Sequence, residues 1–353
     1  MKASPVANPH RAPLPGDQPE AIAQAAQALA RGELVGFPTE TVYGLGGRAD
    51  DDAAVAKIFA AKGRPSDHPL IVHVATAAAA EAFASHMPEV ARRLMAAFWP
   101  GPLTVIVPRA PDMGRAAAGG QDSVGLRCPS HPVAQALLAA AHGLGVAGVA
   151  APSANRFGRV SPTHAEHVVD EFAAWQPPLL VLDGGPCDVG IESAIVDCSQ
   201  GAPVLLRPGV LTREAIEAAA GEPLQDRNAQ SPRASGTLES HYAPDARVVL
   251  MDTAQLMAAL RAWPAVTAGH RRTPSATTAP QRLAVYSRTQ PPVLHSAVLY
   301  RRMPHQPLLA AQELFAVLRE FDAAGVQLIW IEALPPDPEW DGVRDRVQRA
   351  SAR

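Results

Sequence analysis

The sequence lacks the features that are typical of disulfide-rich secreted proteins, of membrane-spanning proteins and of proteins that bind nucleic acid without sequence preference. Its three cysteines, Cys128, Cys187 and Cys198, are too few and too widely spaced for a disulfide framework or a zinc site, which suits a reducing environment. No stretch supplies the ~20 apolar residues that cross a bilayer. The 31 basic and 34 acidic side chains give a formal charge of -3, so no global positive field favours tight, sequence-independent binding to nucleic acid.

The composition that is present describes a globular protein. With 353 residues, of which 47% are hydrophobic and 18% charged, the chain can bury a sizeable core, and its length favours two domains over one. Only three of the 31 basic side chains are lysines, and the others are arginines. Lys62 is therefore notable as a compact ammonium group in an arginine-rich background.

Turn composition and apolar periodicity divide the chain into four segments. Residues 1–19 carry five prolines and no apolar signal core, and we expect residues 1–18 to form a disordered leader. Residues 19–220 alternate helix and strand, which predicts an α/β domain around a mixed, twisted sheet. Residues 221–246 have polar turn composition without a sustained period and are expected to form a linker. Residues 247–353 predict a second, smaller α/β domain.

Periodicity also predicts the individual elements of both domains. Helices are expected at 20–31, 52–61, before Trp99, after Pro132, after Thr163, and at 253–262, 307–322 and 341–350. Strands are expected at 34–37, 70–74, 103–107, 123–127, 146–150, 179–182, 193–196, 204–206, 248–251, 283–286, 297–300 and 328–331. We expect a mobile loop over residues 265–280.

The first polar cluster is the run 39–47, which directly follows an expected strand. Thr39, Glu40 and Thr41 offer two hydroxyls and a carboxylate at a point where α/β proteins often bind ligands. The glycines that follow permit close backbone approach, although the spacing is neither that of a P-loop nor that of a dinucleotide fingerprint. An ordinary turn with capping hydroxyls has the same composition, so this cluster alone assigns no function.

The second cluster is the run 62–73, which begins at an expected helix end. Lys62 can meet a phosphate as a point charge, and Arg64 can grip a phosphate or carboxylate through two hydrogen bonds. The pair could hold a triphosphate, and it could equally be a solvated basic helix end favoured by the macrodipole. His73 ends an apolar strand, where a lone histidine is more often structural than catalytic.

Further polar clusters follow later strands. The strand at 123–127 delivers Arg127 to a turn, where it could meet a substrate carboxylate or form a structural salt bridge. The run 150–163 is rich in small polar groups and could line a nucleotide pocket or cap the next helix. The runs 190–193 and 206–209 add a hydroxyl and another cation, and neither is distinctive alone.

Taken together and in this order, the clusters resemble the YrdC-like family of threonylcarbamoyl-AMP synthases over residues 33–209. The most specific pieces are Pro-Thr-Glu-Thr-Val-Tyr-Gly-Leu at 38–45, Lys-Gly-Arg-Pro at 62–65, Ser-Ala-Asn at 153–155 and Leu-Arg-Pro-Gly at 206–209. His-Tyr-Ala-Pro at 241–244 and the extra domain are similar to the long, two-domain form. The resemblance implies a YrdC-like twisted mixed sheet with helices, and a Rossmann-like C-terminal α/β domain.

The resemblance also implies a division of labour among the site residues. L-Threonine would be bound by Thr39, Thr41, His73, Arg127, Ser193 and the backbone of Ala151. ATP would be bound by Lys62, Arg64, His68, Ser123, Ser153, Asn155, Ser161, Arg207 and, from the linker, Tyr242. Lys62 and Arg64 would be catalytic by stabilising developing charge. No residue is implied as a metal ligand, because Mg²⁺ would arrive with ATP.

The implied activity is that of an L-threonylcarbamoyladenylate synthase, an ATP-dependent nucleotidyltransferase. It would make threonylcarbamoyl-AMP and pyrophosphate from L-threonine, bicarbonate and ATP, in the cytoplasm and away from membranes. Its product would pass to the tRNA threonylcarbamoyl transferase machinery, and a weak contact with tRNA is left open. Two alternatives also stay open: a non-catalytic RNA-binding module, suggested by the excess of arginine, and another carbamoyl- or adenylyl-transferring enzyme with a different acceptor.

Overall fold

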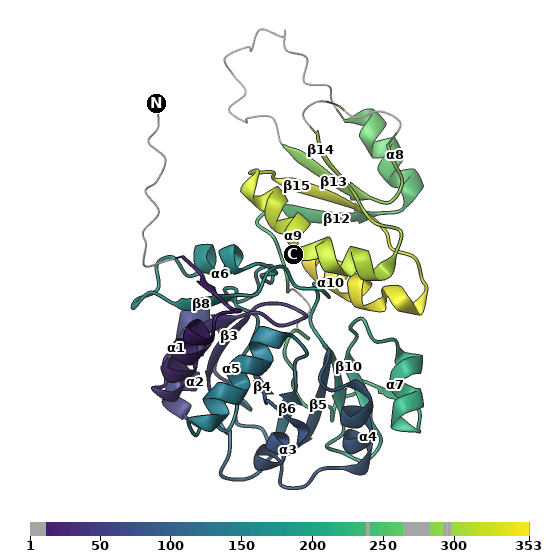
Figure 1. Ribbon diagram of the computed structural model, residues 1–353. Helices are drawn as coiled ribbons and strands as arrows, with labels where there is room; N and C mark the ends of the chain where they lie inside the picture. Colours follow the sequence, from purple (N-terminus) through teal and green to yellow (C-terminus); the bar gives the residue numbers. More distant parts are fainter. Residues whose placement is uncertain (1–11, 238–240, 264–281, 292–294, 296–297, 353) are drawn as a thin grey trace, which may run out of the picture.

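The computed structural model describes residues 12–237, 241–263, 282–291, 295 and 298–352 (Figure 1). Its elements form two sheets, one of 11 strands and one of four. The loop expected at residues 265–280 and residues 1–11 of the expected leader lie outside the described residues.

The large sheet is mixed, as the sequence predicts, and its strands run in the order β1-β8-β2-β3-β7-β4-β6-β5-β9-β10-β11. It contains parallel pairs, such as β4 with β6, and antiparallel pairs, such as β5 with β6. The bounds in chain order are β1 Leu14–Pro15, β2 Val35–Phe37, β3 Gly44–Arg48, β4 Ile71–His73, β5 Leu103–Pro108, β6 Ser123–Arg127, β7 Val149–Ala150, β8 Leu180–Asp183, β9 Ala194–Asp197, β10 Val204–Arg207 and β11 Gln225–Asp226.

Helices pack on both faces of this sheet. Their bounds are α1 Pro19–Ala30, α2 Asp52–Lys62, α3 Ala77–Ala80, the 3-10 turn η1 Glu81–Phe83, α4 Glu89–Phe98, α5 Pro132–Gly143, α6 Ala165–Glu171 and α7 Arg213–Ala220. One apolar core joins α1 and α5 to one face, through residues such as Leu29, Leu137 and Phe37. A second core joins α2, α4, α6 and α7 to the opposite face, with Ile58 and Leu94 among its buried residues.

On part of one face of the large sheet, the described residues that pack together belong to strands and to the linker, and none belongs to a helix. Along β5, Val105 belongs to the core under α4, whereas Ile106 points to the other face and packs with Ile195 and Leu206. Ala234, which lies between the two domains in the sequence, packs against this second group. The linker therefore covers the face of the sheet where α1 and α5 do not reach, and the candidate site lies beside it.

The C-terminal domain is a four-stranded parallel sheet in the order β12-β15-β13-β14. Leu283 and Val285 face α8, whereas Ala284 and Tyr286 face α9 and α10, so helices cover both sides as in a doubly wound fold. The bounds are β12 Arg247–Met251, α8 Thr253–Ala262, β13 Leu283–Ser287, β14 Val298–Arg302, α9 Pro307–Ala323, β15 Leu328–Glu332, the 3-10 turn η2 Pro338–Trp340 and α10 Asp341–Ser351.

Two expectations from the sequence are corrected by the strand pairing. Residues 12–18 are not a disordered leader, because β1 pairs in parallel with β8 and the Gly16 amide donates to the Asp183 carbonyl at 2.7 Å. The glycine-rich run after the first strand is not only a turn, because its second half is β3, paired with β2 and β7. At Gly46 a Cβ would lie 2.8 Å from Phe37 and Val149, so glycine here permits close packing within a strand.

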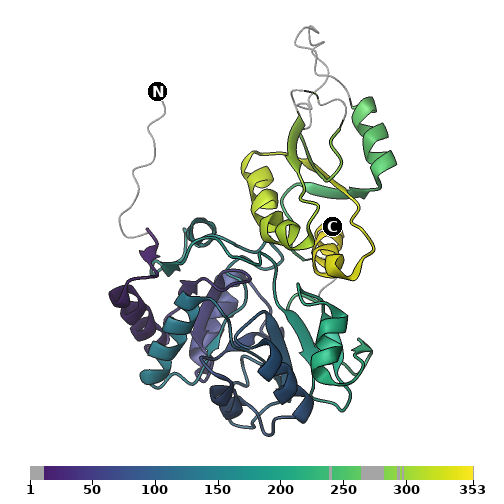
Figure 2. The ribbon, with the colours of Figure 1, turned by 45° about the vertical axis from the view of Figure 1, so that its right-hand side comes forward.

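The two domains are in direct contact, with α10 next to the end of β10 (Figures 1 and 2). Gly190 has φ +80°, and a Cβ there would lie 2.4 Å from the Gln312 backbone of α9. A Cβ on Gly342 of α10 would lie 2.3 Å from the Gly209 carbonyl oxygen. Glycine at both points allows backbone to approach backbone, which brings the C-terminal helices to the edge of the candidate site.

Candidate functional site

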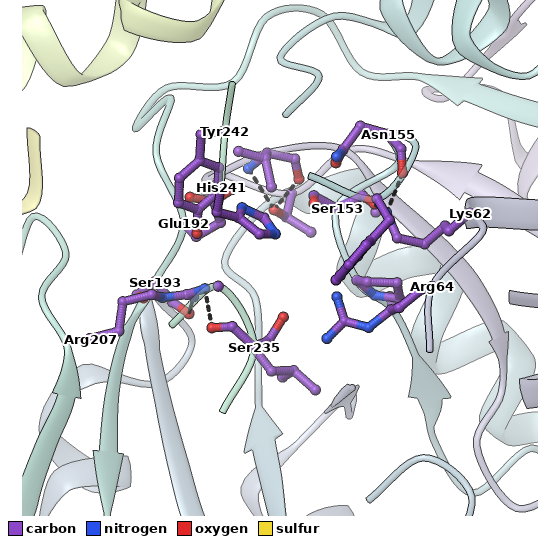
Figure 3. Close-up of a pocket in the computed structure, with 18 of the residues that line it drawn as sticks. Lys62, Arg64, Ser153, Asn155, Glu192, Ser193, Arg207, Ser235, His241 and Tyr242 are labelled. Atoms are coloured by element: carbon purple, nitrogen blue, oxygen red, sulfur yellow. Dashed lines mark hydrogen bonds between the residues drawn. The ribbon is translucent and has the colours of Figure 1, made fainter. Parts of the chain in front are cut away.

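One cavity gathers most of the polar side chains singled out in the sequence (Figure 3). It contains about 550 Å³ of space, part of it open to solvent, between strand ends of the large sheet and the linker. Its lining is Thr39, Val42, Gly44, Lys62, Arg64, Ile71, His73, Arg127, Ala151, Pro152, Ser153, Asn155, Phe157, Gly158, Glu192, Ser193, Arg207, Ser235, Gly236, His241 and Tyr242.

The threonine turn after β2 is fixed by its own hydroxyls. Thr39 Oγ1 donates to the Val42 carbonyl at 2.6 Å and accepts from the amides of Thr41 and Val42 at 3.2 Å. The hydroxyls of Thr39 and Thr41 are 2.9 Å apart. Thr39 therefore faces the cavity in a defined orientation, while Thr41 supports it from a fully buried position.

Arg127 reaches the cavity from the end of β6, in register with His73 on β4. Its Nη2 donates to Glu40 Oε1 at 2.6 Å, and its Nε donates to the Gly101 carbonyl at 3.3 Å. The second oxygen of Glu40 accepts from the Ser130 amide at 3.1 Å. The structural salt bridge considered from the sequence is therefore present, and the same guanidinium also lines the cavity.

Lys62, the last residue of α2, is not a solvated helix end. It is 3% exposed, and its ammonium donates to the Ser153 carbonyl at 2.6 Å and to the Asn155 carbonyl. Burial lowers the pKa of Lys62 well below its ordinary value, and the charge of Arg64 lowers it further. The lysine thus holds the Ser153–Asn155 loop against α2, and an ammonium has a third N–H for a ligand.

Arg64 follows the left-handed helix end at Gly63, whose φ is +62°. Its Nη2 donates to the Pro69 carbonyl at 2.9 Å, and its guanidinium lies 5.6 Å from the centre of the Phe157 ring. Burial lowers the pKa of Arg64 to about 10, so the group stays positively charged near neutral pH. Figure 3 shows Lys62 and Arg64 on one side of the cavity and Arg207 on the other.

Arg207, at the end of β10, ties the linker to the cavity. Its Nε and Nη2 donate to the Ser193 carbonyl at 3.1 and 2.9 Å, and its Nη1 donates to the Ser235 carbonyl of the linker at 2.8 Å. Ser193 Oγ lies 2.8 Å from the hydroxyl of Thr104 on β5. This arginine therefore fixes the strand end and the linker together.

Farther along the linker, Tyr242 closes the cavity from above. It has φ +60°, an unfavourable conformation for a residue with a side chain, and is 1% exposed. Gly236 has φ +72°, and a Cβ there would lie 2.2 Å from the Tyr242 hydroxyl, so glycine suits this crossing. His241 packs edge-on to the tyrosine, with ring centres 4.2 Å apart.

Unpartnered polar atoms concentrate in this cavity. Within the described part of the chain, five buried side-chain nitrogen or oxygen atoms have no hydrogen-bond partner, and four of them belong to cavity residues. These four are His73 Nδ1, Asn155 Oδ1, His241 Nδ1 and Tyr242 Oη. Each such atom costs roughly 1–3 kcal/mol unless a partner satisfies it, which points to a polar ligand.

Four of the residues expected at the site do not line the cavity itself. Thr41 lies behind Thr39, and Ser161 lies behind the wall, where its hydroxyl donates to Glu192. Ser123 lines a neighbouring cleft beneath the linker. His68 packs against Phe157, with ring centres 5.3 Å apart, and its pKa is lowered by burial.

The structure also places residues in the lining that were not assigned a role from the sequence, including Phe157, Glu192, Ser235, Gly236 and His241. Glu192 and His241 belong to the runs 190–193 and 241–244, which were already singled out in the sequence. Their position in those runs was the one indication in the sequence that they could belong to the site. Ser235 and Gly236 had only turn composition. Among the described residues, no group of three His, Cys, Asp or Glu side chains could hold a metal ion.

Comparison with known proteins agrees with this two-domain α/β architecture. A family model described as "Telomere recombination", covering the Sua5, YciO and YrdC proteins, matches residues 27–209. A second, described as "Threonylcarbamoyl-AMP synthase, C-terminal domain", matches residues 211–352. The chain belongs to the Sua5/YciO/YrdC family, in its two-domain form, which confirms the resemblance found in the sequence.

Individual relatives agree with the family models. A threonylcarbamoyl-AMP synthase of Bacillus subtilis is 46% identical over 237 residues, covering 65% of this chain and 66% of the relative. One of Schizosaccharomyces pombe is 31% identical, covering 96% of this chain and 90% of the relative. The structure of Pyrococcus abyssi Sua5 complexed with L-threonine has a TM-score of 0.82 at 34% identity, with 95% of each chain covered.

Within the described residues, no helix is long and apolar enough to cross a membrane.

Proposed function

We propose that this chain is an L-threonylcarbamoyladenylate synthase, an ATP-dependent nucleotidyltransferase that serves the threonylcarbamoyladenosine modification of tRNA. The relatives named threonylcarbamoyl-AMP synthase support the activity, and the L-threonine complex of the Pyrococcus abyssi protein supports the amino-acid substrate. The single observation that carries the proposal is one cavity that combines an ordered hydroxyl turn, four buried cations and four unpartnered polar atoms.

L-Threonine fits the part of the cavity formed by Thr39, His73 and Arg127. The guanidinium of Arg127 would bind the substrate carboxylate through charge-assisted hydrogen bonds. Burial lowers the pKa of His73 to about 3, so its imidazole is neutral and its unpartnered Nδ1 offers a hydrogen bond without a competing charge. Ser193 and the backbone of Ala151 complete this side of the cavity.

ATP would lie between the cations on two facing walls of the cavity, with Lys62 and Arg64 on one side and Arg207 on the other. Arg64 and Arg207 would bind phosphate oxygens, and Lys62 would add a point charge from the loop that it holds. Ser153 and Asn155 belong to that loop, and Tyr242 would cover the nucleotide. Ser123, Ser161 and His68 would act from behind or beside the lining. We assign the catalytic role to Lys62 and Arg64, because preorganised cations stabilise the charge that develops during transfer.

The reaction needs no covalent protein nucleophile. The neutral amine of threonine combines with bicarbonate to give a carbamate and water. A carbamate oxygen then attacks the α-phosphorus of ATP, the bond to the bridging oxygen breaks, and pyrophosphate leaves with the electron pair. Placement of the two reactants and stabilisation of charge by the cavity cations account for the rate enhancement.

Magnesium would enter with the substrate. Mg²⁺ binds proteins through one or two carboxylates plus substrate phosphates, and among the described residues this cavity offers a single lining carboxylate, Glu192. That donor set fits an ion carried by the polyphosphate, where it would supply charge neutralisation. Both oxygens of Glu192 already accept hydrogen bonds, from Ser161 and Arg346.

The linker would protect the reactive species from water. Arg207 holds Ser235 over the cavity, and Gly236 and Tyr242 close against each other. Exclusion of water would limit loss of the carbamate and hydrolysis of the mixed anhydride. The product would pass to a tRNA threonylcarbamoyl transferase in the cytoplasm. The three buried free cysteines are compatible with that reducing compartment.

A pyrophosphate-release assay tests this function. Purified protein with ATP, L-threonine, bicarbonate and Mg²⁺ is expected to release pyrophosphate, and omission of any one component should abolish the release. A panel of other amino acids tests the acceptor in the same assay. Absence of pyrophosphate, under conditions where a control synthase is active, would refute the proposal, and turnover that depends on another amino acid would reject threonine.

A further inference from the structure

Arg346 belongs to the C-terminal domain, yet its side chain ends beside the cavity of the other domain. It lies on α10 and is 0% exposed, which is unusual for an arginine. Its Nε donates to Glu192 Oε2 at 2.9 Å, and its Nη2 donates to the Glu192 carbonyl at 3.0 Å. Its Nη1 donates to the Pro208 carbonyl at 2.9 Å and to Asp345 at 2.8 Å. Three of these four hydrogen bonds cross the domain boundary, to Glu192 and Pro208.

Glu192 is the cavity carboxylate that this arginine neutralises. Burial raises the pKa of Glu192, but the charges of Arg346 and Arg207 and the hydrogen bond from Ser161 outweigh it, so the pKa is lowered. The carboxylate is therefore ionised inside a cavity that also contains Arg207 and Lys62. Without Arg346, its negative charge would have to be balanced by those two cations.

Arg346 also contacts the ring of Tyr242. Its guanidinium lies 5.4 Å from the centre of the tyrosine ring, within the range of a cation–π contact. Phe315 of α9 contacts the same ring, with centres 5.4 Å apart. The C-terminal domain therefore holds both the wall residue Glu192 and the linker residue Tyr242, and the close glycine contacts at the boundary keep it in place.

We propose that Arg346 is a positioning residue for the nucleotide: it pairs with Glu192 so that Arg207 and Lys62 stay available to the polyphosphate, and it holds Tyr242 over the cavity. The proposal rests on the proposed function. It gives the C-terminal domain a specific role in completing a site formed otherwise by the large sheet and the linker. Arg127, which has its own partner in Glu40, belongs to the threonine side and is independent of this pair.

Calorimetry on the full chain separates positioning from mere support of the fold. The probes are α,β-methylene-ATP, which is not cleaved, and L-threonine. In Arg346→Met, we expect the Kd for α,β-methylene-ATP to rise at least about tenfold, and the Kd for L-threonine to stay within about twofold. A partly unfolded protein would instead show fewer binding sites for both probes with unchanged Kd values.

Arg344→Met is the matched control. It removes an arginine from the same helix, whose contacts are to Asp341 and to the carbonyls of Pro335 and Asp337 in its own domain. Both probes should bind this variant as they bind the parent protein. The double variant Glu192→Gln/Arg346→Met removes the unbalanced charge, so its Kd for the nucleotide analogue should fall below that of Arg346→Met. Arg346→Lys keeps the charge with fewer directed donors and should be intermediate.

The outcomes distinguish this inference from the proposed function. If the parent protein binds both probes and Arg346→Met binds the nucleotide analogue equally well, the positioning role is wrong while the function stands. Loss of sites without a change in Kd would also overturn it. If the parent protein binds neither probe, the proposed function fails, and the positioning role fails with it.

Discussion

Arg127 illustrates how a side chain at this site is held before a ligand arrives. It is buried, ion-paired with Glu40 and still part of the cavity lining. The sequence raised a substrate-binding role and a structural salt bridge as alternatives, and the geometry accommodates both. The same is true of Lys62, which holds a loop and also faces the cavity.

Replacing Arg127 should weaken L-threonine binding specifically. Arg127 alone cannot be removed cleanly, because an unpaired buried Glu40 would cost about 3–5 kcal/mol of stability. We therefore compare the double variant Glu40→Gln/Arg127→Gln, which removes both charges of the pair, with the parent protein. The double variant should lose about 1.5–3 kcal/mol of L-threonine binding free energy relative to the parent protein, and little affinity for α,β-methylene-ATP, as measured by calorimetry. Equal L-threonine affinities would exclude Arg127 from the carboxylate site.

Among individual residues, the cations of the candidate site could be predicted from the sequence. Residues that reach the cavity only because of the path of the backbone could not. Arg127, Lys62 and Arg207 were singled out because cations at strand and helix ends imply anionic ligands. Ser235 and Gly236 line the cavity because Arg207 and Tyr242 hold the linker there. Nothing in their own composition indicates that contact, which depends on chain segments far apart in sequence.

The strand β3 shows the corresponding limit for elements. A run of glycines has low strand propensity, and its composition indicates a turn. β3 can nevertheless pair with β2 and β7, because Gly46 has no side chain. Phe37 and Val149 occupy the space that a side chain there would need. By contrast, α8 and β6 have the bounds that periodicity predicted, since local signals dominate there.

Gly46→Ala should test the packing of β3. The added Cβ would lie 2.8 Å from Phe37 and Val149, and overpacking of this kind costs about 1–3 kcal/mol. Gly143→Ala, at the end of α5, is the control, because a Cβ there meets nothing within 4 Å. Chemical denaturation should show a loss of unfolding free energy only for Gly46→Ala. Similar stability of the two variants would contradict the close packing described for β3.

For the whole molecule, buried neutral histidines couple stability to pH. Burial lowers the pKa of both His73 and His241 to about 3. Between that value and the unfolded pKa of about 6.5, the unfolded chain binds more protons than the folded one. Their contribution to stability is therefore fully present above about pH 6.5 and is lost as the pH falls toward 3.

Denaturation curves between pH 7.5 and pH 5 measure this effect. Each histidine should contribute a slope of about 1.4 kcal/mol per pH unit below its unfolded pKa. The double variant His73→Asn/His241→Asn removes both groups and should have a correspondingly flatter pH dependence. An unchanged slope in that variant would show that these histidines are not buried in the neutral form.

At the scale of the whole molecule, sequence alone identified two α/β domains and the family, but not how one domain serves the other. Arg346 lies in a helix of ordinary amphipathic composition, and nothing near it in the sequence indicates a partner at Glu192. That pairing depends on the docking of α10 at Gly209, which is a property of the assembled fold. The contribution of the C-terminal domain to the cavity could therefore be found only from the structure.

The most direct test of the central claim is identification of the product by mass spectrometry. Protein is incubated with ATP, L-threonine, Mg²⁺ and ¹³C-labelled bicarbonate, with a parallel reaction that lacks threonine. We predict threonylcarbamoyl-AMP carrying the ¹³C label in the complete reaction and none without threonine. Absence of this product from an active, folded preparation, or a labelled adduct of a different acceptor, would contradict the account.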